Sequence, residues 1–473
     1  MTSNATERLG TVLVLGLGRT GESVARYAAS LVPSRVDSVT LYGGASSTPG
    51  EKAGELEAAG VTVICGTEDV RGSYDLAVAS PGIPETSEFF RAAAACSREV
   101  IGEPEFAFRE SPERWVAITG TNGKTTTTSL ATHLLREGGL LAESVGNIGT
   151  LVTDRVSVRP EGEWFVAELS SFQLATTRLL HPRVSVILNV TPDHLEWHGT
   201  MEAYAAAKER ALENQCAGDL AVVSVDDDFC RAMAERAEAR GLRVCRLSVH
   251  EEPSSPCAAF LRDGSLVVRL DGTEHALVDA SELKIFGRHN AENALAAASV
   301  ALELGVSEGD VCRGLVSFSP IEHRIEPAGV VGGVRYVNDS KATNTDSVEK
   351  ALTAFDEGTI VVLLGGHDKM TDLSSLARAV CDRCFAAVCY GEAGERIARA
   401  LEDAREGSDS KLVVLRAPHL REAFDEAVRV ARTGDTVLLS PACSSFDEFS
   451  NMGERGRLFK ELVRNLADGG ESA

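Results

Sequence analysis

The sequence predicts an α/β protein of three domains, each built on a parallel sheet covered by helices. Short apolar runs rich in β-branched residues recur along the chain, and helical stretches separate them, which is the pattern of such sheets. The chain has 473 residues, too many for one ordinary core. At roughly 150 residues per domain, about three domains are expected.

The first domain is predicted to cover residues 1–104. It opens with an apolar strand, TVLVLG (11–16), and a helix-like stretch, ESVARYAASL (22–31). Two further apolar segments, VTVI (61–64) and LAVAS (76–80), continue the sheet. This alternation, with a glycine-rich turn after the first strand, is typical of a Rossmann-like domain.

The second domain is predicted to cover residues 105–320. Its strands are WVAITG (115–120), WFVAELS (164–170) and VSVILNV (184–190), whose continuous apolar character indicates burial on both faces. The alanine-rich segment AENALAAASVALELG (291–305) predicts a helix that ends in glycine.

The third domain is predicted to cover residues 321–473 and to be Rossmann-like as well. Its apolar strands are VRYVNDS (334–340), TIVVLLGG (359–366) and DTVLLSPA (435–442). Each ends in small or polar residues. Because ligands of such sheets bind beyond the carboxyl ends of the strands, these ends are expected to carry a site.

Composition excludes several classes of protein. Acidic residues outnumber basic ones by 70 to 47, for a formal charge of −23, which opposes general binding to nucleic acid. No run of 18 apolar residues occurs, so no membrane insertion is expected. The N-terminal MTSNATERLG lacks the basic and apolar regions of a secretory signal.

The cysteine content predicts a reduced, cytoplasmic protein. The 11 cysteines are odd in number and scattered along the chain, unlike a disulfide framework. Cys381 and Cys384 form a CxxC with Cys389 nearby, but no second ligand pair stands at zinc spacing. We therefore predict that these thiols pack in a core.

A phosphate-binding loop is predicted in ITGTNGKTTTTSL (118–130), between a strand and a helix. Gly120 and Gly123 let backbone amides converge on phosphate oxygens, and the helix N-terminus adds positive potential. Lys124 is expected to neutralise the β and γ phosphates, and the Thr125 hydroxyl to reach Mg²⁺. The loop departs from the strict G-x-x-x-x-G-K-[ST] pattern at Ile118.

A second glycine pattern, GLGRTGES, follows the first strand. Gly16, Gly18 and Gly21 alone predict a dinucleotide site, and hence an NAD-dependent oxidoreductase. The next strand ends in Tyr42-Gly43-Gly44, without the acidic residue such a site needs, and that reading leaves Lys124 unexplained. A non-catalytic nucleotide sensor is a further alternative.

Seven motifs together resemble the Mur ligases, most closely those that add D-glutamate. The related folylpolyglutamate synthetases share the phosphate loop, so they and other Mur-type ligases remain alternatives. The motifs run in order over nearly the whole chain, which makes them specific jointly. They are GTNGKTT (120–126), AELSSFQL (167–174), NVTPDHLEWHG (189–199), FGRHNAEN (286–293), NDSKATN (338–344), GGHDK (365–369) and SPACSSFDEF (440–449).

The resemblance implies an ATP-dependent amide ligase of peptidoglycan synthesis that joins D-glutamate to UDP-MurNAc-L-Ala. A carboxylate has no good leaving group, so the γ-phosphoryl group of ATP makes an acyl phosphate that the D-glutamate amine attacks. Anionic charge builds at both stages and needs cations placed in advance. The resemblance also implies two Mg²⁺ ions, a CO₂-derived carbamate on Lys208 and a monomer.

The nucleotide and metal residues follow from matching the motifs. Carbamylation of Lys208 turns a cation into an anion with oxygen donors, which suits Mg²⁺. His198 lies four residues after His194, but the resemblance assigns only His194 to metal, so zinc is not expected. The implied ATP-binding residues are Gly120, Thr121, Asn122, Gly123, Lys124, Thr125, Thr126, Asn290, Asn293, Arg324 and Asp339. The implied metal ligands are Thr125, Glu168, His194 and Lys208 as its carbamate. The implied catalytic residues are Lys124, His194, Lys208, Arg324 and Lys341.

The substrate residues follow in the same way, and domain closure is expected to bring the third domain to the phosphate loop. The sequence departs from the family at Gly43, where an Asp is common, and at Met452, where a second Phe is common. The implied UDP-substrate residues, in the first domain and at the second, are Gly18, Arg19, Thr20, Ser80, Pro81, Gly82 and Asn147. The implied D-glutamate residues are Thr343, Lys369, Ser445 and Phe446.

Overall fold

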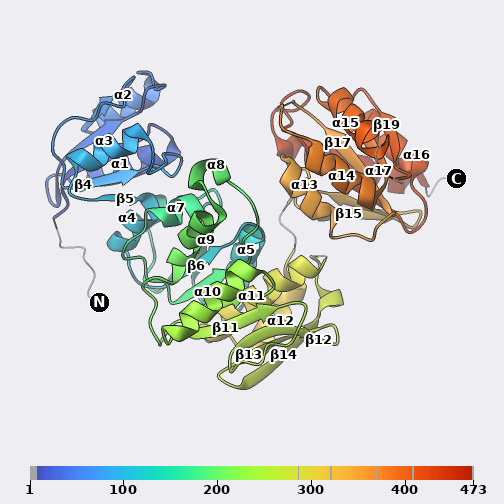
Figure 1. The fold of residues 1–473 in the computed structure, drawn as a ribbon, viewed down its shortest axis with the longest axis horizontal. Helices are drawn as coiled ribbons and strands as arrows, with labels where there is room; N and C mark the ends of the chain where they lie inside the picture. Colours follow the sequence, from blue (N-terminus) through green and yellow to red (C-terminus); the bar gives the residue numbers. More distant parts are fainter. Residues whose placement is uncertain are drawn as a thin grey trace. The chain divides into compact units, whose positions relative to one another are not determined.

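Three separate sheets, each with helices packed on it, make up the described part of the chain (Figure 1). The structure is a computed structural model that describes residues 8–285, 287–319, 322–368, 370–406, 408 and 410–470. The three-domain α/β prediction is confirmed. The chain divides into two compact units, which we call unit 1 (residues up to 282 with 291–317) and unit 2 (283–290 with the residues from 318 on). The finer domain boundaries at 104/105 and 320/321 stay a prediction.

The first sheet, in unit 1, is parallel throughout, with strand order β3-β2-β1-β4-β5. The order reverses between β1 and β4, and ligands of such sheets bind beyond the carboxyl ends of the strands at this reversal. The strands are β1 (Gly10–Leu15), β2 (Val36–Tyr42), β3 (Val61–Ile64), β4 (Leu76–Ala79) and β5 (Val100–Gly102). The helices are α1 (Arg19–Ser30), α2 (Glu51–Ala58) and α3 (Glu88–Cys96).

The second sheet, also in unit 1, has the order β14-β13-β12-β11-β10-β9-β6-β8-β7. Its core strand β6 lies between β8 and β9, parallel to both, so the loop after β6 is flanked by two further strand ends. The parallel strands are β6 (Trp115–Thr119), β7 (Ala142–Gly146), β8 (Trp164–Glu168), β9 (Val184–Ile187), β10 (Leu220–Ser224) and β11 (Arg243–Ser248), with β12 (Ala258–Arg262) parallel to β11.

Helices cover this second sheet and connect its strands. The longest described ones are α5, which follows β6, and α11, the alanine-rich helix. The helices are α4 (Glu103–Glu110), α5 (Lys124–Glu137), α6 (Val152–Val156), α7 (Ser171–Ala175), α8 (Leu195–His198), α9 (Met201–Glu209), α10 (Asp228–Ala239), α11 (Arg288–Glu303) and α12 (Glu308–Ser317), with 3-10 turns η1 (Arg210–Leu212) and η2 (Ala280–Glu282).

One edge of the second sheet differs from the predicted parallel arrangement. Strands β13 (Ser265–Leu270) and β14 (Thr273–Asp279) run antiparallel to their neighbours. The hairpins turn at Asp263-Gly264 and Asp271-Gly272, where all four residues have positive φ. Two such residues in succession make the tight turn whose twist suits a β-hairpin.

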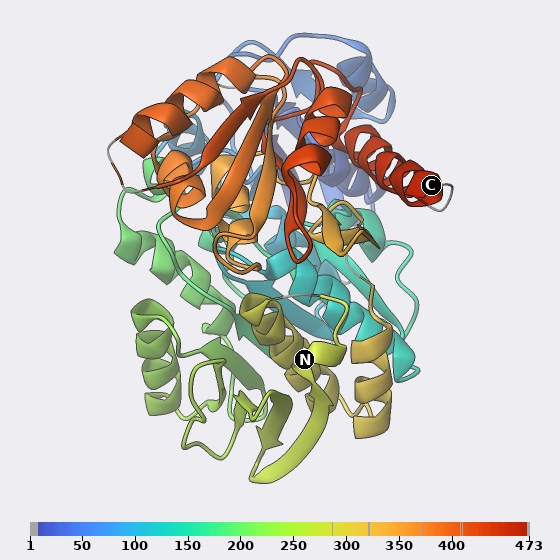
Figure 2. The same cartoon turned by 90° about the vertical axis from the view of Figure 1, so that its right-hand side faces the viewer.

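The third sheet, in unit 2, has the order β15-β16-β20-β17-β18-β19 and carries helices on both faces (Figure 2). One face packs on α13–α15 and the other on α16 and α17, and each forms its own apolar core. Only the edge strand β15 runs antiparallel among the described strands of this sheet. The strands are β15 (Glu326–Val331), β16 (Val334–Asn338), β17 (Ile360–Gly365), β18 (Cys384–Tyr390), β19 (Val413–Arg416) and β20 (Thr436–Ala442). The helices are α13 (Thr345–Leu352), α14 (Ser374–Arg383), α15 (Gly394–Glu406), α16 (Leu420–Val430) and α17 (Met452–Gly470).

None of the helices in the described residues is both long and apolar enough to cross a bilayer.

Candidate active site

The predicted phosphate loop joins the buried end of β6 to the start of α5. Gly123 has a φ of +81°, and a Cβ there would overlap Asn293 Oδ1, so only glycine fits. Asn189 holds the loop from β9, accepting from Asn122 N at 2.8 Å through Oδ1 and from Thr121 N through its own carbonyl. The loop is therefore fixed by the neighbouring strand end before any ligand arrives.

Two lysines meet at one oxygen of this loop. Lys124 Nζ donates to Gly120 O at 2.8 Å and to Thr121 O at 2.9 Å. Lys208, from α9, donates its Nζ to the same Gly120 O at 2.8 Å. The two nitrogens thus lie no farther apart than twice that distance. Two residues far apart in the sequence thus share one acceptor.

The environment of Lys208 favours the neutral amine. The side chain is 1% exposed, and its Nζ lies 4.4 Å from the centre of the Tyr204 ring. Burial first, and the positive charge of Lys124 second, hold the pKa of the Lys208 ammonium well below its usual range. A neutral amine is the form that can react with an electrophile such as CO₂.

Glu168 ends β8, the strand beside the loop strand, with Ile118 as its partner across the sheet. Its Oε1 accepts from Asn147 Nδ2 at 2.8 Å, whereas Oε2 is buried and has no hydrogen-bond partner among the described residues. A buried carboxylate oxygen without a partner is costly unless a cation binds it. The buried carboxylate of Glu168 beside the phosphate loop therefore fits a cation, and oxygen is the donor that Mg²⁺ prefers.

His194 lies just before α8 with a φ of +52°. Its ring packs on Phe172 at 4.7 Å, and its Nε2 lies 3.5 Å from an oxygen of Asp193. His198 forms a hydrogen bond of 2.9 Å with Ser171 Oγ. The two histidines therefore have different polar neighbours.

Asn290 and Asn293, two of the implied ATP-binding residues, lie at the start of α11. Asn293 Oδ1 accepts from Thr127 Oγ1, on α5, at 3.1 Å, so this side chain contacts the helix that follows the loop. Asn290 is buried inside the first turn of α11, where its N–H donates to Gly287 O at 2.9 Å. It lies within the helix rather than at the capping position that precedes it.

The implied UDP residues of the first domain follow the carboxyl ends of β1 and β4, whereas Asn147 lies beside Glu168 in the second sheet. Gly18 precedes α1, and Arg19 and Thr20 begin that helix, so backbone amides of a helix N-terminus are available to an anion. Ser80 follows β4, and its N–H donates to Leu15 O at 3.1 Å. Ser80 Oγ is buried with no partner among the described residues. Pro81 and Gly82 continue this turn.

In unit 2 the implied residues lie at the carboxyl ends of β16 and β20. Asp339 is 3% exposed and accepts from Ser440 Oγ at 2.7 Å, and burial raises its carboxyl pKa to about 7. Phe446 is 70% exposed. Arg324, Lys341, Thr343 and Ser445 lie in this unit too. Lys369 lies outside the described residues.

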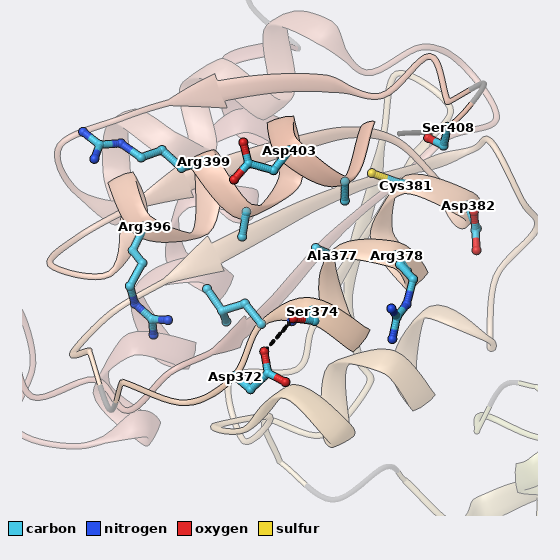
Figure 3. A pocket seen from close by; sticks show the side chains of 13 residues that line it. Asp372, Ser374, Ala377, Arg378, Cys381, Asp382, Arg396, Arg399, Asp403 and Ser408 are labelled. Carbon is cyan, nitrogen blue, oxygen red and sulfur yellow. Dashed lines mark hydrogen bonds between the residues drawn. The ribbon is translucent and has the colours of Figure 1, made fainter. Parts of the chain in front are cut away.

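A pocket of about 730 Å³ between α14 and α15 is a separate feature of unit 2 (Figure 3). Arginine and aspartate side chains share its lining, and none of the implied site residues contributes to it. Cys381 borders it, but Cys381, Cys384 and Cys389 all belong to the apolar core, where burial raises the pKa of each thiol.

Comparison with known proteins identifies the family. The Mur ligase middle domain matches residues 118–301, and the Mur ligase glutamate ligase domain matches residues 323–443. The UDP-N-acetylmuramoylalanine--D-glutamate ligase of Pelotomaculum thermopropionicum is 40% identical over 460 residues, 97% of this chain and 98% of that protein. This protein belongs to the Mur ligase family.

Further relatives support the assignment to the Mur ligase family. The ligase of the same name from Salinibacter ruber is 41% identical over 424 residues, covering 88% of this chain and 90% of that one. Among solved structures, the UDP-N-acetylmuramate-alanine ligase MurC from Thermotoga maritima aligns with a TM-score of 0.54 at 19% identity, covering 96% and 99% of the two chains. At that identity the likeness establishes the fold alone.

Proposed function

We propose that this Mur ligase joins D-glutamate to the L-alanine carboxylate of UDP-N-acetylmuramoyl-L-alanine at the expense of ATP. Relatives that share its length carry that activity in their names. The observation that carries the chemistry is the meeting of Lys124, Lys208 and Glu168 around the phosphate loop. An NAD-dependent oxidoreductase, which transfers hydride, does not require two lysines and a carboxylate around a phosphate loop.

The phosphate loop binds and orients ATP in the first step. Its backbone amides and Lys124 neutralise the triphosphate, so that the substrate carboxylate oxygen can approach the γ-phosphorus. The P–O bond to ADP breaks as the new P–O bond forms, giving an acyl phosphate. Magnesium, held by Thr125 and Glu168, would supply Lewis-acid stabilisation of the phosphate charge.

The second step makes the amide. The amine of D-glutamate, having lost a proton, attacks the acyl carbon, and inorganic phosphate leaves. Lys341 and Arg324 are assigned to the reacting phosphate, Asp339 to the ribose, and Thr343, Lys369, Ser445 and Phe446 to D-glutamate. These residues belong to unit 2, so closure of unit 2 on the phosphate loop is part of the proposal.

Lys208 is assigned a carbamate. Its buried neutral amine adds to CO₂, losing one proton, and the product carries two oxygens in place of a cation. A carbamate there would neutralise the positive charge of Lys124. Its oxygens, together with His194, would provide ligands for the second Mg²⁺. Burial and the contact with Gly120 O support this assignment.

Phosphate release tests the substrate assignment. The full-length protein is incubated with ATP, Mg²⁺ and UDP-MurNAc-L-Ala, and then with D-Glu, L-Glu, L-Ala or meso-diaminopimelate. We expect release with D-Glu only. Equal release with L-Glu would refute the assignment, and ATP hydrolysis needing neither substrate would favour a nucleotide sensor.

The Lys124→Ala variant separates the roles of the domains. Turnover should be lost while binding of the UDP substrate, measured by calorimetry, stays within about twofold of wild type. Loss of both would contradict the assignment of the UDP substrate to the first domain. A cytoplasmic location and a monomeric state, checked by fractionation and light scattering, complete the proposal.

A further inference from the structure

A fully buried arginine lies below the carboxyl edge of the third sheet. Arg455, in the first turn of α17, is 0% exposed. Its Nε donates to Ser340 Oγ and its Nη2 to Ser340 O, both at 2.9 Å. Nη2 also donates to Cys443 O at 3.1 Å, and Nη1 donates to Ser444 O at 3.4 Å.

These contacts join two of the three loops that carry the residues assigned to D-glutamate, and the third loop passes close by. Ser340 belongs to the loop after β16, which carries Lys341 and Thr343. Cys443 and Ser444 belong to the loop after β20, which carries Ser445 and Phe446. The loop after β17, which leads to Lys369, passes so close that a Cβ at Gly366 would lie 3.1 Å from Arg455 Nη1.

The loops are also tied to one another around this side chain. Ser340 Oγ donates onward to Met452 O at 2.7 Å, which anchors the first loop to the start of α17. Ala442 N donates to Ala342 O at 3.0 Å, and His367 N donates to Ser444 O at 2.9 Å. Loss of the guanidinium would therefore loosen three loops together, because each connects to the others through the same region.

The charge of Arg455 acts on the buried carboxyl of Asp339, but the two groups form no ion pair in the described residues. All four of its acceptors are uncharged oxygens, and no carboxylate of the described residues forms an ion pair with it. A buried cation without a counterion is costly unless an anion arrives nearby. D-Glutamate carries two carboxylates, so a positive charge below its loops would favour it in the bound state.

We propose that Arg455 is a positioning residue for D-glutamate, which holds the three loops in their binding geometry and adds a buried positive charge beneath them. This inference rests on the proposed function, because it names the substrate of the same reaction. Arg455 is not expected to touch the reacting atoms.

Steady-state kinetics of Arg455→Lys in the full chain test the inference. Lysine keeps the charge but loses the planar fork that reaches two loops at once. We expect the KM for D-glutamate to rise at least tenfold, with the KM values for ATP and the UDP substrate within twofold of wild type. Arg464→Lys, an exposed residue of the same helix, is the matched control and should change none of them.

Two further measurements keep the test decisive if the lysine variant folds poorly. Ser340→Ala removes a single acceptor and should raise the D-glutamate KM about threefold while the protein stays folded. Arg455→Ala should regain D-glutamate affinity when methylguanidinium is added, because the cation can fill the cavity.

The outcomes separate the two hypotheses. If the wild type releases phosphate without regard to D-glutamate, the proposed function fails. If the wild type needs D-glutamate but Arg455→Lys lowers only the melting temperature, or raises all three KM values alike, the arginine is a stability element and the inference is overturned. Absence of rescue by methylguanidinium together with an unchanged KM in Ser340→Ala would overturn it too.

Discussion

Replacing Lys208 with methionine gives an unusual combination of effects. Methionine has nearly the same length and no charge, so it fills the same buried space. We expect the variant to lose activity at least 1000-fold, because no carbamate can form, and yet to be more stable than the unmodified wild type. Most substitutions of buried residues destabilise a protein.

The size of the effect follows from the geometry at Gly120 O. At a pH below the folded pKa of Lys208, its ammonium and that of Lys124, which share this acceptor at 2.8 Å each, repel by about 3 kcal/mol at an effective dielectric constant of about 20. The lost hydrogen bond from Lys208 costs about 1 kcal/mol. The net gain of about 2 kcal/mol corresponds to a rise in melting temperature of roughly 3 °C for a unit of about 300 residues.

The stability gain of the Lys208→Met variant over the unmodified wild type should also depend on pH. Since the Lys208 pKa is lower in the folded protein than in the unfolded chain, unfolding takes up a proton between the two pKa values. Wild-type stability therefore rises with pH in this window by about 1.4 kcal/mol per unit and is lost as pH falls through the folded pKa. The methionine variant lacks this slope, so its advantage shrinks above neutral pH.

Thermal unfolding from pH 6.5 to 9.5 in CO₂-free buffer measures both effects. Lys52→Met, at an exposed lysine of unit 1, is the control and should leave the slope unchanged. Added bicarbonate should stabilise the wild type and not the methionine variant. A variant that melts below the wild type at pH 7, or parallel pH slopes for the two proteins, would refute the reasoning.

Three further substitutions probe the rest of the site. Gly123→Ala should abolish ATP binding in calorimetry, because the positive φ and the overlap with Asn293 Oδ1 distort the loop, and affinity within threefold of wild type would contradict this. Glu168→Gln should raise the Mg²⁺ concentration for half-maximal activity at least tenfold, because the buried carboxylate loses its charge. An unchanged Mg²⁺ requirement would exclude Glu168 as a metal ligand. Asp339→Asn should flatten the pH dependence of stability of unit 2. Because the folded pKa of about 7 exceeds the usual 3.8, the wild type loses stability as pH rises through this window, and an equal loss in the variant would show that another group titrates.

Local sequence patterns were sufficient to predict the parallel strands and the phosphate loop. Apolar runs such as 184–190 form strands because side chains buried on both faces need no alternation. The order glycine, lysine, threonine after such a strand defines a loop through backbone geometry, which the sequence sets locally. The antiparallel hairpin was missed, although Asp263-Gly264 and Asp271-Gly272 carried a turn signal for it.

Packing determined which side chains acquire unusual chemistry. On its pattern Lys208 is a surface lysine of an amphipathic helix, and Arg455 stands in a helix full of charges. The fold buries both, and it places the Lys208 amine on a carbonyl 88 residues away in the sequence. Residue spacing along the chain determines local backbone conformation, so the phosphate loop could be predicted from the sequence. The burial of charged groups and the distances between them arise only when remote segments pack together. The electrostatics of the site were therefore determined by the tertiary structure.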